Sequence, residues 1–295
     1  MVAQIKKLGI EDTAYPKLLK EILDAPQELY YKGELPKPHE IIIGIVGTRK
    51  ATHGGKIIAK QIAQELAQKG ILIASGLALG IDSAAHEGAL LGGGKTIAVL
   101  ANGLDVVYPR QHYALAKKIL STKGLLLSEY PEGTPAYPNQ FLERNRIISG
   151  LSTALILIEA PIRSGSLATA RNALNQGREV LVVPGPANHP NYQGSHMLLR
   201  EGARLVRNAE DVIEDLGLDS QINTNKKSDV VDIKTNLSKE EKIILEAIKN
   251  SKKPATVDKI AEETKLEPII ITQGLTFLTL QNIIKEKNGR FKLTE

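Results

Sequence analysis

The sequence of 295 residues contains no cysteine and no tryptophan, and its aromatic residues are eight tyrosines and three phenylalanines. Without cysteine the chain has no disulfide, no thiolate metal site and no cysteine nucleophile. With so few rings, binding of nucleic acid should depend more on charged contacts to the phosphodiester backbone than on a broad stacking platform. The rings in or beside the loops considered below are Tyr108, Tyr130, Tyr137, Phe141 and Tyr192.

Long hydrophobic runs are also missing. No stretch approaches the ~20 apolar residues of a membrane span, and the N-terminus lacks the apolar segment of a signal peptide. We therefore expect a cytoplasmic protein with no membrane partner. The formal net charge of +5 and the isoelectric point near 9.1 are compatible with a polyanionic partner. This bias is mild, so the local placement of charge has to identify the partner.

The length predicts about two domains, at roughly 150 residues each. Residues 1–217 should form the first domain, which begins with a lead segment at 1–40 that carries an amphipathic helix at Tyr15–Leu23. Residues 218–236 are polar and poor in aromatic residues, which is typical of a flexible linker. Residues 237–295 should form a small second domain.

From Ile41 onward, apolar runs of strand length alternate with helical stretches. The expected strands are Ile41–Val46, Ile71–Ala74, Thr96–Ala101, Leu125–Leu127, Ala154–Ile158 and Val180–Val183. The expected helices are Lys56–Gln68, Ser83–Leu91, His112–Leu120, Gln140–Ser149 and Leu167–Gln176. This alternation predicts an α/β fold with a doubly wound parallel sheet, in which ligands bind beyond the carboxyl ends of the strands.

A nicotinamide cofactor is disfavoured by two features. Gly47 follows a strand, but the loop reads Gly44-Ile-Val-Gly47-Thr-Arg-Lys and lacks the Gly-x-Gly-x-x-Gly fingerprint. The strand at Ile71 ends in Ala74-Ser75-Gly76, without the acidic residue that binds a ribose in dinucleotide-binding folds. No dense cluster of metal ligands is present either, so we expect neither a cofactor nor a metal.

The stretch Phe141–Thr169 combines a basic helix with Arg144 and Arg146, a buried strand, and a turn at Ser164-Gly165-Ser166 that opens the next helix. The first turn of a helix exposes free N–H groups and the positive end of the helix dipole, which is a natural anion site. The alternative interpretation of this turn is ordinary capping by Ser164. Both interpretations remain open at the level of the sequence.

Arg49 has two interpretations as well: a solvated or ion-paired side chain, or a clamp for phosphate, whose oxygens match the guanidinium fork. Convergence with Ser75-Gly76, the two arginines and the Ser164 turn favours the clamp. Glu159 at a strand end is a candidate general base, but no hydroxyl nucleophile with a paired histidine is evident. We expect a protein that is not an enzyme. The remaining candidates for chemistry, which we interpret as architecture, are Asp82, His86, Asp105 and Glu129.

Several motifs in this order resemble the DprA/Smf family of DNA-processing proteins of bacterial natural transformation. They are Val46-Gly47-Thr48-Arg49, Ser75-Gly76-Leu77-Ala78-Leu79-Gly80-Ile81-Asp82, Phe141 with Arg144-Asn145-Arg146-Ile147-Ile148-Ser149-Gly150-Leu151, Glu159-Ala160, Ser164-Gly165-Ser166-Leu167-Ala168-Thr169-Ala170, Gly177-Arg178-Glu179-Val180 and Pro184-Gly185. Two departures are Thr48, where the family usually has serine, and His196, where it usually has asparagine.

The resemblance implies an extended Rossmann-like fold that binds single-stranded DNA, forms homodimers and loads the RecA recombinase in homologous recombination during competence. For the homodimer interface, the apolar residues of the segment from Met197 to Val206 are our expectation. The residues expected to bind DNA are Gly47, Arg49, Ser75, Gly76, Phe141, Arg144, Asn145, Arg146, Ser164, Gly165, Ser166 and Thr169.

Two other functions stay open. The first is a nucleotide-processing enzyme of the phosphoribohydrolase type, which uses a related sheet but generally carries a Pro-Gly-Gly-x-Gly-Thr turn that Ser164-Gly165-Ser166-Leu167 does not supply. Release of base from nucleoside monophosphates would identify it. The second is a protein scaffold, which would not retain DNA at low salt.

In the C-terminal segment 237–295, a pattern of three helices followed by a β-hairpin predicts a winged-helix domain. Ser238 and Glu241 make a capping box for a helix to Ile248, two helices follow near Val257–Glu263 and Pro268–Leu280, and Asn288-Gly289 is a hairpin turn. The stretch that would read DNA, Leu266 to Asn282, contains no Lys or Arg, although base and phosphate contacts normally need them. We therefore expect this domain to contact protein, with weak electrostatic help from Lys285, Lys287, Arg290 and Lys292.

Overall fold

The computed structural model describes residues 4–218, 238–251, 254–280, 284–287 and 289–293. The chain divides into two compact units, residues 1–225 and 226–295. The predicted linker, apart from Leu218, lies outside the described residues. Leu218 itself is buried in the core of the first unit. Among the described residues, no helix combines the length and the hydropathy that crossing a membrane requires.

The first unit is built on a nine-stranded sheet with the strand order β1-β2-β6-β5-β4-β3-β7-β8-β9. β1 and β2 pair antiparallel, β2 pairs antiparallel with β6, and the pairs from β6 to β9 are parallel. The strands are β1 (Lys6–Gly9), β2 (Glu28–Gly33), β3 (Ile42–Val46), β4 (Leu72–Ser75), β5 (Thr96–Leu100), β6 (Leu125–Ser128), β7 (Ala154–Leu157), β8 (Glu179–Val182) and β9 (Arg204–Leu205). The predicted α/β fold with an extended Rossmann-like parallel sheet is confirmed.

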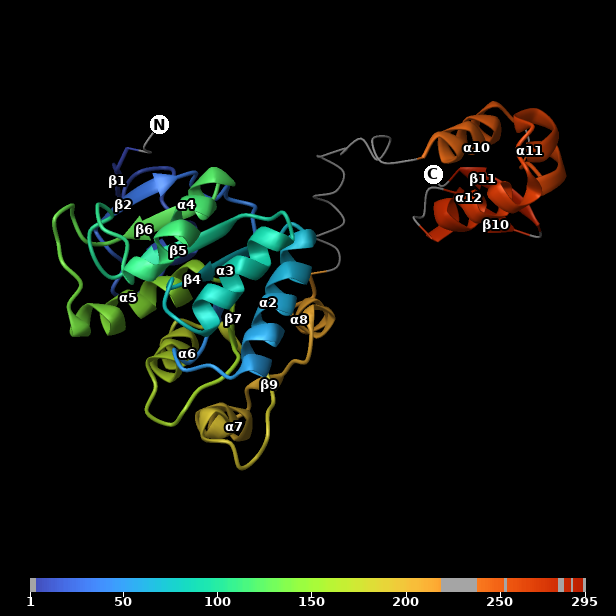
Figure 1. The fold of residues 1–295 in the computed structure, drawn as a ribbon. Coiled ribbons are helices and arrows are strands. Elements are labelled where there is room, and N and C mark those ends of the chain that lie inside the picture. The colour runs from blue at the N-terminus through green and yellow to red at the C-terminus, as the bar shows by residue number, and fades with distance from the viewer. Residues whose placement is uncertain (1–3, 219–237, 252–253, 281–283, 288, 294–295) are drawn as a thin grey trace. The chain divides into compact units, whose positions relative to one another are not determined.

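Helices cover both faces of this sheet, and Figure 1 shows α2 and α3 side by side on one of them. Apolar side chains of α2, α3 and α8 pack on that face, and those of α1, α5, α6 and α7 pack on the other. The helices are α1 (Lys17–Lys20), α2 (His53–Gln68), α3 (Ile81–Leu91), α4 (Tyr113–Ser121), α5 (Pro138–Leu151), α6 (Gly165–Asn175), α7 (Gln193–Arg200) and α8 (Ala209–Asp215), with short 3-10 turns at Arg110–His112 and Pro190–Tyr192.

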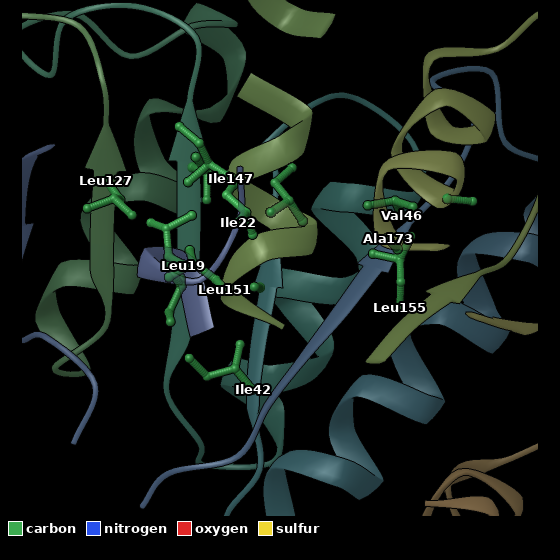
Figure 2. Close-up of a cluster of buried hydrophobic side chains, with 14 of the residues drawn as sticks. Leu19, Ile22, Ile42, Val46, Leu127, Ile147, Leu151, Leu155 and Ala173 are labelled. Atoms are coloured by element: carbon green, nitrogen blue, oxygen red, sulfur yellow. The ribbon is translucent and has the colours of Figure 1, made fainter. Parts of the chain in front are cut away.

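Alternation along the strands produces the two cores. In β3, Ile43 and Ile45 face α2 and α3, whereas Ile42 and Val46 face α5 and α6. Figure 2 shows the second of these cores, where side chains of the central strands meet those of α1 and α5. Successive side chains of a strand point to opposite faces, so a strand covered on both faces must be apolar throughout. That is why β3 and β7 are unbroken apolar runs and why β4 is apolar up to Ser75 at its end.

The lead segment differs from its prediction. The expected helix at Tyr15–Leu23 is reduced to Lys17–Lys20, and the segment supplies two strands that extend the sheet beyond β6. Leu29 of β2 is fully buried, and Leu19 of α1 packs into the core beside α5. Most residues of β1 and β2 are exposed or half-buried, so these strands lack the apolar run by which the central strands stand out in the sequence.

The direction in which the sheet is wound reverses between β3 and β7, which are neighbours. From β3 the chain proceeds to β4, β5 and β6 on one side, and from β7 to β8 and β9 on the other. The loops that leave the carboxyl ends of β3 and β7 therefore diverge and leave a crevice between them. In open α/β sheets this point is where ligands bind.

The described part of the second unit has three helices followed by an antiparallel strand pair, in the order that the sequence predicts. A capping box joins Ser238 and Glu241: Ser238 N–H donates to Glu241 Oε2 over 2.8 Å and Glu241 N–H donates to Ser238 Oγ over 3.1 Å. In the predicted turn, Asn288 lies outside the described residues and Gly289 has φ near 70°. The elements are α10 (Lys239–Asn250), α11 (Val257–Thr264), α12 (Pro268–Leu280), β10 (Ile284–Lys287) and β11 (Arg290–Leu293). The winged-helix assignment stays a prediction.

Candidate nucleic-acid interface

A cleft of about 520 Å³ lies at this reversal point of the sheet. Its walls are the loop after β3, the loop between β7 and α6, and the N-terminal half of α5. Of the twelve predicted site residues, nine line this cleft and three do not. The nine are Gly47, Arg49, Phe141, Arg144, Asn145, Ser164, Gly165, Ser166 and Thr169, and the other three are Ser75, Gly76 and Arg146.

The exposed Arg49 and the half-buried Phe141 form the charged and aromatic part of the cleft. The Arg49 side chain is exposed, and its guanidinium lies over the Phe141 ring at 4.8 Å from the centroid. The Tyr108 ring tilts against the same phenyl group at 5.5 Å. None of the ion pairs among the described residues involves Arg49. Its charge is therefore free to meet an anion, while the ring holds it at the mouth of the cleft.

The start of α6 combines both interpretations of the serine-glycine turn. Ser164 caps the helix, because its Oγ accepts a hydrogen bond from the Leu167 N–H over 3.2 Å. The N–H groups of Gly165 and Ser166 have no acceptor within the helix, since they belong to its first turn. Gly165 is exposed and lines the cleft. The cap thus organises the turn and leaves donors for an anion.

Arg163 is a cleft residue that the sequence analysis missed. It is exposed and lies in the loop directly before Ser164. The sequence could have indicated Arg163, because it directly precedes the Ser164-Gly165-Ser166 turn. A residue next to an anion-binding turn lies at the same edge of the cleft. Together with Arg49 it gives the cleft an exposed guanidinium on each side.

Arg144 lies at the floor of the cleft rather than at its rim, and its contact with phosphate stays a prediction. Its side chain is 3% exposed, and its Nη1 donates to the Gly76 carbonyl over 2.7 Å and to the Val99 carbonyl. Burial lowers the pKa of Arg144 to about 10, against the opposing pull of the Asp82 carboxylate. By donating to these two carbonyls, the Arg144 guanidinium holds the carboxyl-terminal ends of β4 and β5 together. We call this arrangement the Arg144 brace.

The buried Asp82 completes this brace. Its carboxylate accepts hydrogen bonds from the N–H groups of Gly76 and Ala78 over 3.1 and 3.4 Å. Burial raises the pKa of Asp82, and the Arg144 charge and the two backbone donors oppose that shift. The predicted structural role of Asp82 agrees with this geometry.

The other polar residues of the predicted site form hydrogen bonds to backbone carbonyls, and its glycines leave room for neighbouring side chains. Ser75 is fully buried and donates to the Ile45 carbonyl over 2.6 Å, and Gly76 leaves the space that the Arg144 guanidinium fills. A side chain at Gly47 would meet Ile81. Ser75 and Gly76 thus shape the cleft from beneath. Asn145 Nδ2 donates to the Gly165 carbonyl over 3.2 Å, and Thr169 Oγ1 donates to the same carbonyl over 3.1 Å.

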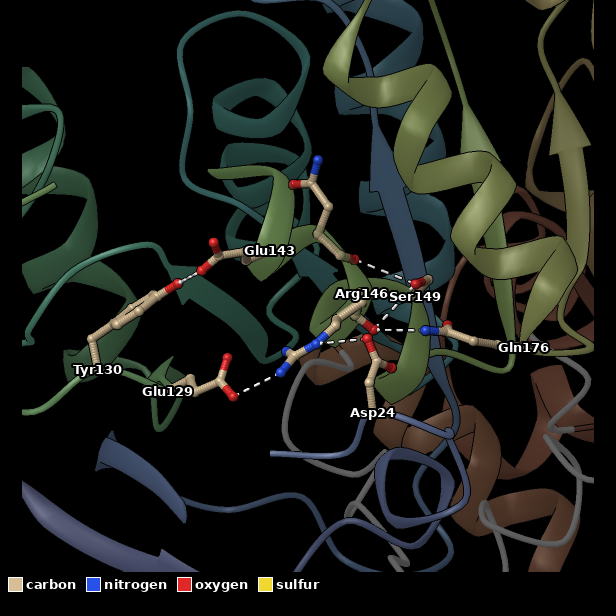
Figure 3. Close-up of polar contacts among 8 residues, drawn as sticks. Asp24, Glu129, Tyr130, Glu143, Arg146, Ser149 and Gln176 are labelled. Atoms are coloured by element: carbon tan, nitrogen blue, oxygen red, sulfur yellow. Dashed lines mark hydrogen bonds and ion pairs between the residues drawn. The ribbon is translucent and has the colours of Figure 1, made fainter. Parts of the chain in front are cut away.

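Arg146 lies outside the cleft, so the structure does not bring it together with Arg49. Figure 3 shows its guanidinium between two carboxylates, with Nε 2.9 Å from Asp24 Oδ2 and Nη2 2.7 Å from Glu129 Oε1. It lines a separate cleft with these acids and Glu143. Residues 144 and 146 of one helix point about 200° apart, given the helical repeat. The sequence motif Arg-Asn-Arg therefore cannot place both arginines in one site.

A buried histidine beneath the cleft predicts a pH dependence of stability. Thr96 donates its hydroxyl to the Ile73 carbonyl, so His86 Nδ1 carries the proton and donates to Thr96 Oγ1 over 2.7 Å. Burial lowers the pKa of His86 to about 3, and the neighbouring His112 and Arg144 charges add to this shift. The folded protein thus keeps His86 neutral over a range in which the unfolded chain takes up a proton.

The free energy of unfolding should therefore fall on acidification from pH 6.5 toward pH 3, by up to about 1.4 kcal/mol per pH unit from this group. Urea denaturation followed by circular dichroism across that range measures the slope. His86→Asn should lose this contribution, and His53→Asn, at an exposed position, should retain it. Equal slopes in all three proteins would contradict the assignment.

Within the described residues, His, Asp and Glu side chains form no group of three that could hold a metal ion. The candidate base Glu159 is fully buried and lies behind the cleft wall. Burial by itself would raise the pKa of Glu159, but hydrogen bonds from Thr52, Asn191 and Tyr192 outweigh it and lower the pKa. A carboxylate so engaged is a poor proton acceptor.

Comparison with known proteins gives a family. The family model of DNA recombination-mediator protein A matches residues 6–217. Protein Smf of Escherichia coli (strain K12) is 45% identical over 202 residues, covering 68% of this chain and 54% of that protein. The DNA processing protein DprA of Bacillus subtilis (strain 168) is 42% identical over 215 residues, covering 72% of this chain and 71% of that protein. The match thus spans about half the length of the first relative.

Comparison with solved structures indicates the same family. The X-ray structure of DprA from Streptococcus pneumoniae is 41% identical with a TM-score of 0.68, covering 72% of this chain and 74% of that chain. DprA from Helicobacter pylori, whose structure was described for its unique single-stranded DNA binding mode, is 32% identical with a TM-score of 0.64. That alignment covers 77% of this chain and 98% of that chain.

The matched region contains the sheet, the cleft and every motif on which the resemblance was based. The fold and the family expected from those motifs are therefore both confirmed. This chain belongs to the DNA recombination-mediator protein A family, whose curated members are the DNA-processing proteins DprA and Smf.

Proposed function

We propose that this protein binds single-stranded DNA in the cleft and acts as a recombination mediator that loads a RecA recombinase onto the strand. The observation that carries the proposal is the Arg49 guanidinium, held on Phe141 and free of any described ion pair, opposite the first turn of α6. The guanidinium and the Gly165 and Ser166 N–H groups suit phosphate oxygens. The ring suits a base.

Single strands fit this arrangement better than a duplex does. A base can stack on a side chain at the mouth of a cleft only when it is unpaired and unstacked from its neighbours. The single-stranded DNA binding mode described for the Helicobacter pylori relative supports this choice. The family's description as recombination mediators supports the proposed loading of RecA. We place this activity in the cytoplasm as part of the proposal.

We further propose that the protein is not an enzyme. Glu159 was the candidate base, and its oxygens are occupied by hydrogen bonds from Thr52, Asn191 and Tyr192. Asp82 at the floor is braced by backbone donors. These contacts argue against the phosphoribohydrolase alternative, which needs an available carboxylate.

A homodimer through the 197–206 region remains our proposal for assembly, with one change from the sequence-based expectation. Leu198 is buried in the core, so it cannot belong to an interface. Leu205 on the edge strand β9 is 49% exposed, and an open edge with an apolar side chain is suited to pairing with another chain. Sedimentation velocity tests this proposal, since a monomer at micromolar concentration would contradict it.

The function is tested by gel shift with single-stranded and duplex oligonucleotides of equal length, using the full chain and residues 1–225. We expect both proteins to retain single strands in preference to duplex. Because we propose that the C-terminal unit contacts protein, the two should shift duplex equally. Incubation with nucleoside monophosphates serves as the enzymatic control. Release of base, or equal retention of duplex, would reject the proposal.

A further inference from the structure

The buried carboxylate of Glu159 joins the loops on both sides of the cleft. It lies just after β7 and is fully buried. Its oxygens accept hydrogen bonds from the Thr52 N–H over 3.0 Å, from the Thr52 hydroxyl, from Asn191 Nδ2 over 2.8 Å and from the Tyr192 hydroxyl over 3.0 Å. Four donors therefore converge on a group that has only acceptors.

The loop that carries Arg49 is fastened at its start, middle and end, either to Glu159 itself or to Asn191, which also bonds the Glu159 carboxylate. At its start, the Thr48 N–H donates to the Glu159 backbone carbonyl over 2.8 Å. In its middle, Asn191 Nδ2 donates both to the Lys50 carbonyl over 3.0 Å and to Glu159. At its end, Thr52 is held by two hydrogen bonds and begins α2. Arg49 is thus enclosed between anchored residues.

A carboxylate accepts all four of these hydrogen bonds. The Glu159 side chain fills the space beside Gly55, where even a methyl group would meet the carboxylate. The first turn of α2 therefore lies against a negative charge, as the helix dipole favours. An amide at position 159 has one acceptor oxygen and an NH2 group with two donors. Its oxygen could still accept from the Thr52 N–H and Asn191 Nδ2, but the Thr52 and Tyr192 hydroxyl protons would lose their acceptor.

We propose that Glu159 is the positioning residue of the DNA site: it does not touch DNA, but it fixes the loop from Thr48 to Thr52 so that Arg49 is held over Phe141 at the cleft. This inference rests on the proposed function. It accounts for a buried carboxylate at the carboxyl end of a central strand in a protein for which we propose no catalysis. It also couples the 189–192 segment to the cleft through Asn191 and Tyr192.

The test compares Glu159→Gln, Arg49→Ala and the double variant in full-length protein, by measuring affinity for a single-stranded oligonucleotide as a function of salt. Glu159→Gln should weaken binding about 10-fold, within the range that substitutions in contact networks produce. Its salt slope should approach that of Arg49→Ala. In the Arg49→Ala background the same change should add less than about 2-fold, because the residue it positions is already absent.

A second pair of variants guards against a folding defect. Thr52→Ser keeps the donor to Glu159 and the cap of α2, and should bind like the wild type, whereas Thr52→Val should show the Glu159→Gln defect. Glu179→Gln, at the exposed start of β8, is the matched control and should bind normally. Circular dichroism establishes that each variant is folded.

The outcomes separate this inference from the proposed function. If the wild type does not bind single strands, or Arg49→Ala binds equally well, the proposed function fails and the inference fails with it. If Arg49→Ala is defective but folded Glu159→Gln and Thr52→Val bind normally, only the inference is overturned. Additive effects of Glu159→Gln and Arg49→Ala would also overturn it, since they would mean that Glu159 acts by another route.

Discussion

Replacing Arg49 with alanine should weaken binding of single-stranded DNA by at least about 10-fold, because a charge-assisted contact contributes roughly 1.5 to 3 kcal/mol. The slope of log affinity against log salt should become shallower by about 0.7, the value for one phosphate neutralised on a single strand. Fluorescence anisotropy of a labelled oligonucleotide, titrated at several salt concentrations, measures both quantities.

The matched control for this prediction is Arg146→Ala. Both variants lose one positive charge, but the Arg146 guanidinium is paired with Asp24 and Glu129 and lies outside the cleft. Its removal should leave the salt slope unchanged and the affinity within about 2-fold, because two carboxylates already neutralise it. A shallower slope for Arg146→Ala than for Arg49→Ala would mean that DNA follows the acidic side of α5, contrary to the proposed site.

Replacing Arg144 with methionine should destabilise the first unit by about 3 to 5 kcal/mol, the usual effect of removing one partner of a buried charge pair. The side chain is 3% exposed, and its loss would leave the Gly76 and Val99 carbonyls without their donor and Asp82 without its neighbouring cation. Urea denaturation followed by circular dichroism measures the effect.

The double variant Arg144→Met, Asp82→Asn is the control for this second prediction. Since the neutral amide no longer needs the cation, the double variant should be more stable than the sum of the two single effects predicts. A loss of DNA affinity with no loss of stability in Arg144→Met would contradict the structural role and return Arg144 to the predicted phosphate contact.

The sequence by itself determined the sheet and the family. β3, β4 and β7 were predictable because a central parallel strand is buried on both faces and therefore reads as a nearly continuous apolar run. The start of α6 was predictable because Ser164 is a helix cap in the sequence and in the structure. Such features depend on residues close together in the chain, so the pattern alone contains them.

Only the tertiary structure decided the environment of each arginine. The sequence alone does not distinguish the three arginines. In the structure, Arg49 is exposed over the Phe141 ring, Arg144 bonds the carbonyls of two strands, and Arg146 is paired with two carboxylates. These differences arise from partners that are distant in the chain, such as Val99 for Arg144 and Asp24 for Arg146. The antiparallel strands of the lead segment and the hydrogen bonds around Glu159 depend on distant partners as well. A side chain's burial and its charge neutralisation are set by contacts that form only when the chain has folded, and no local pattern records them.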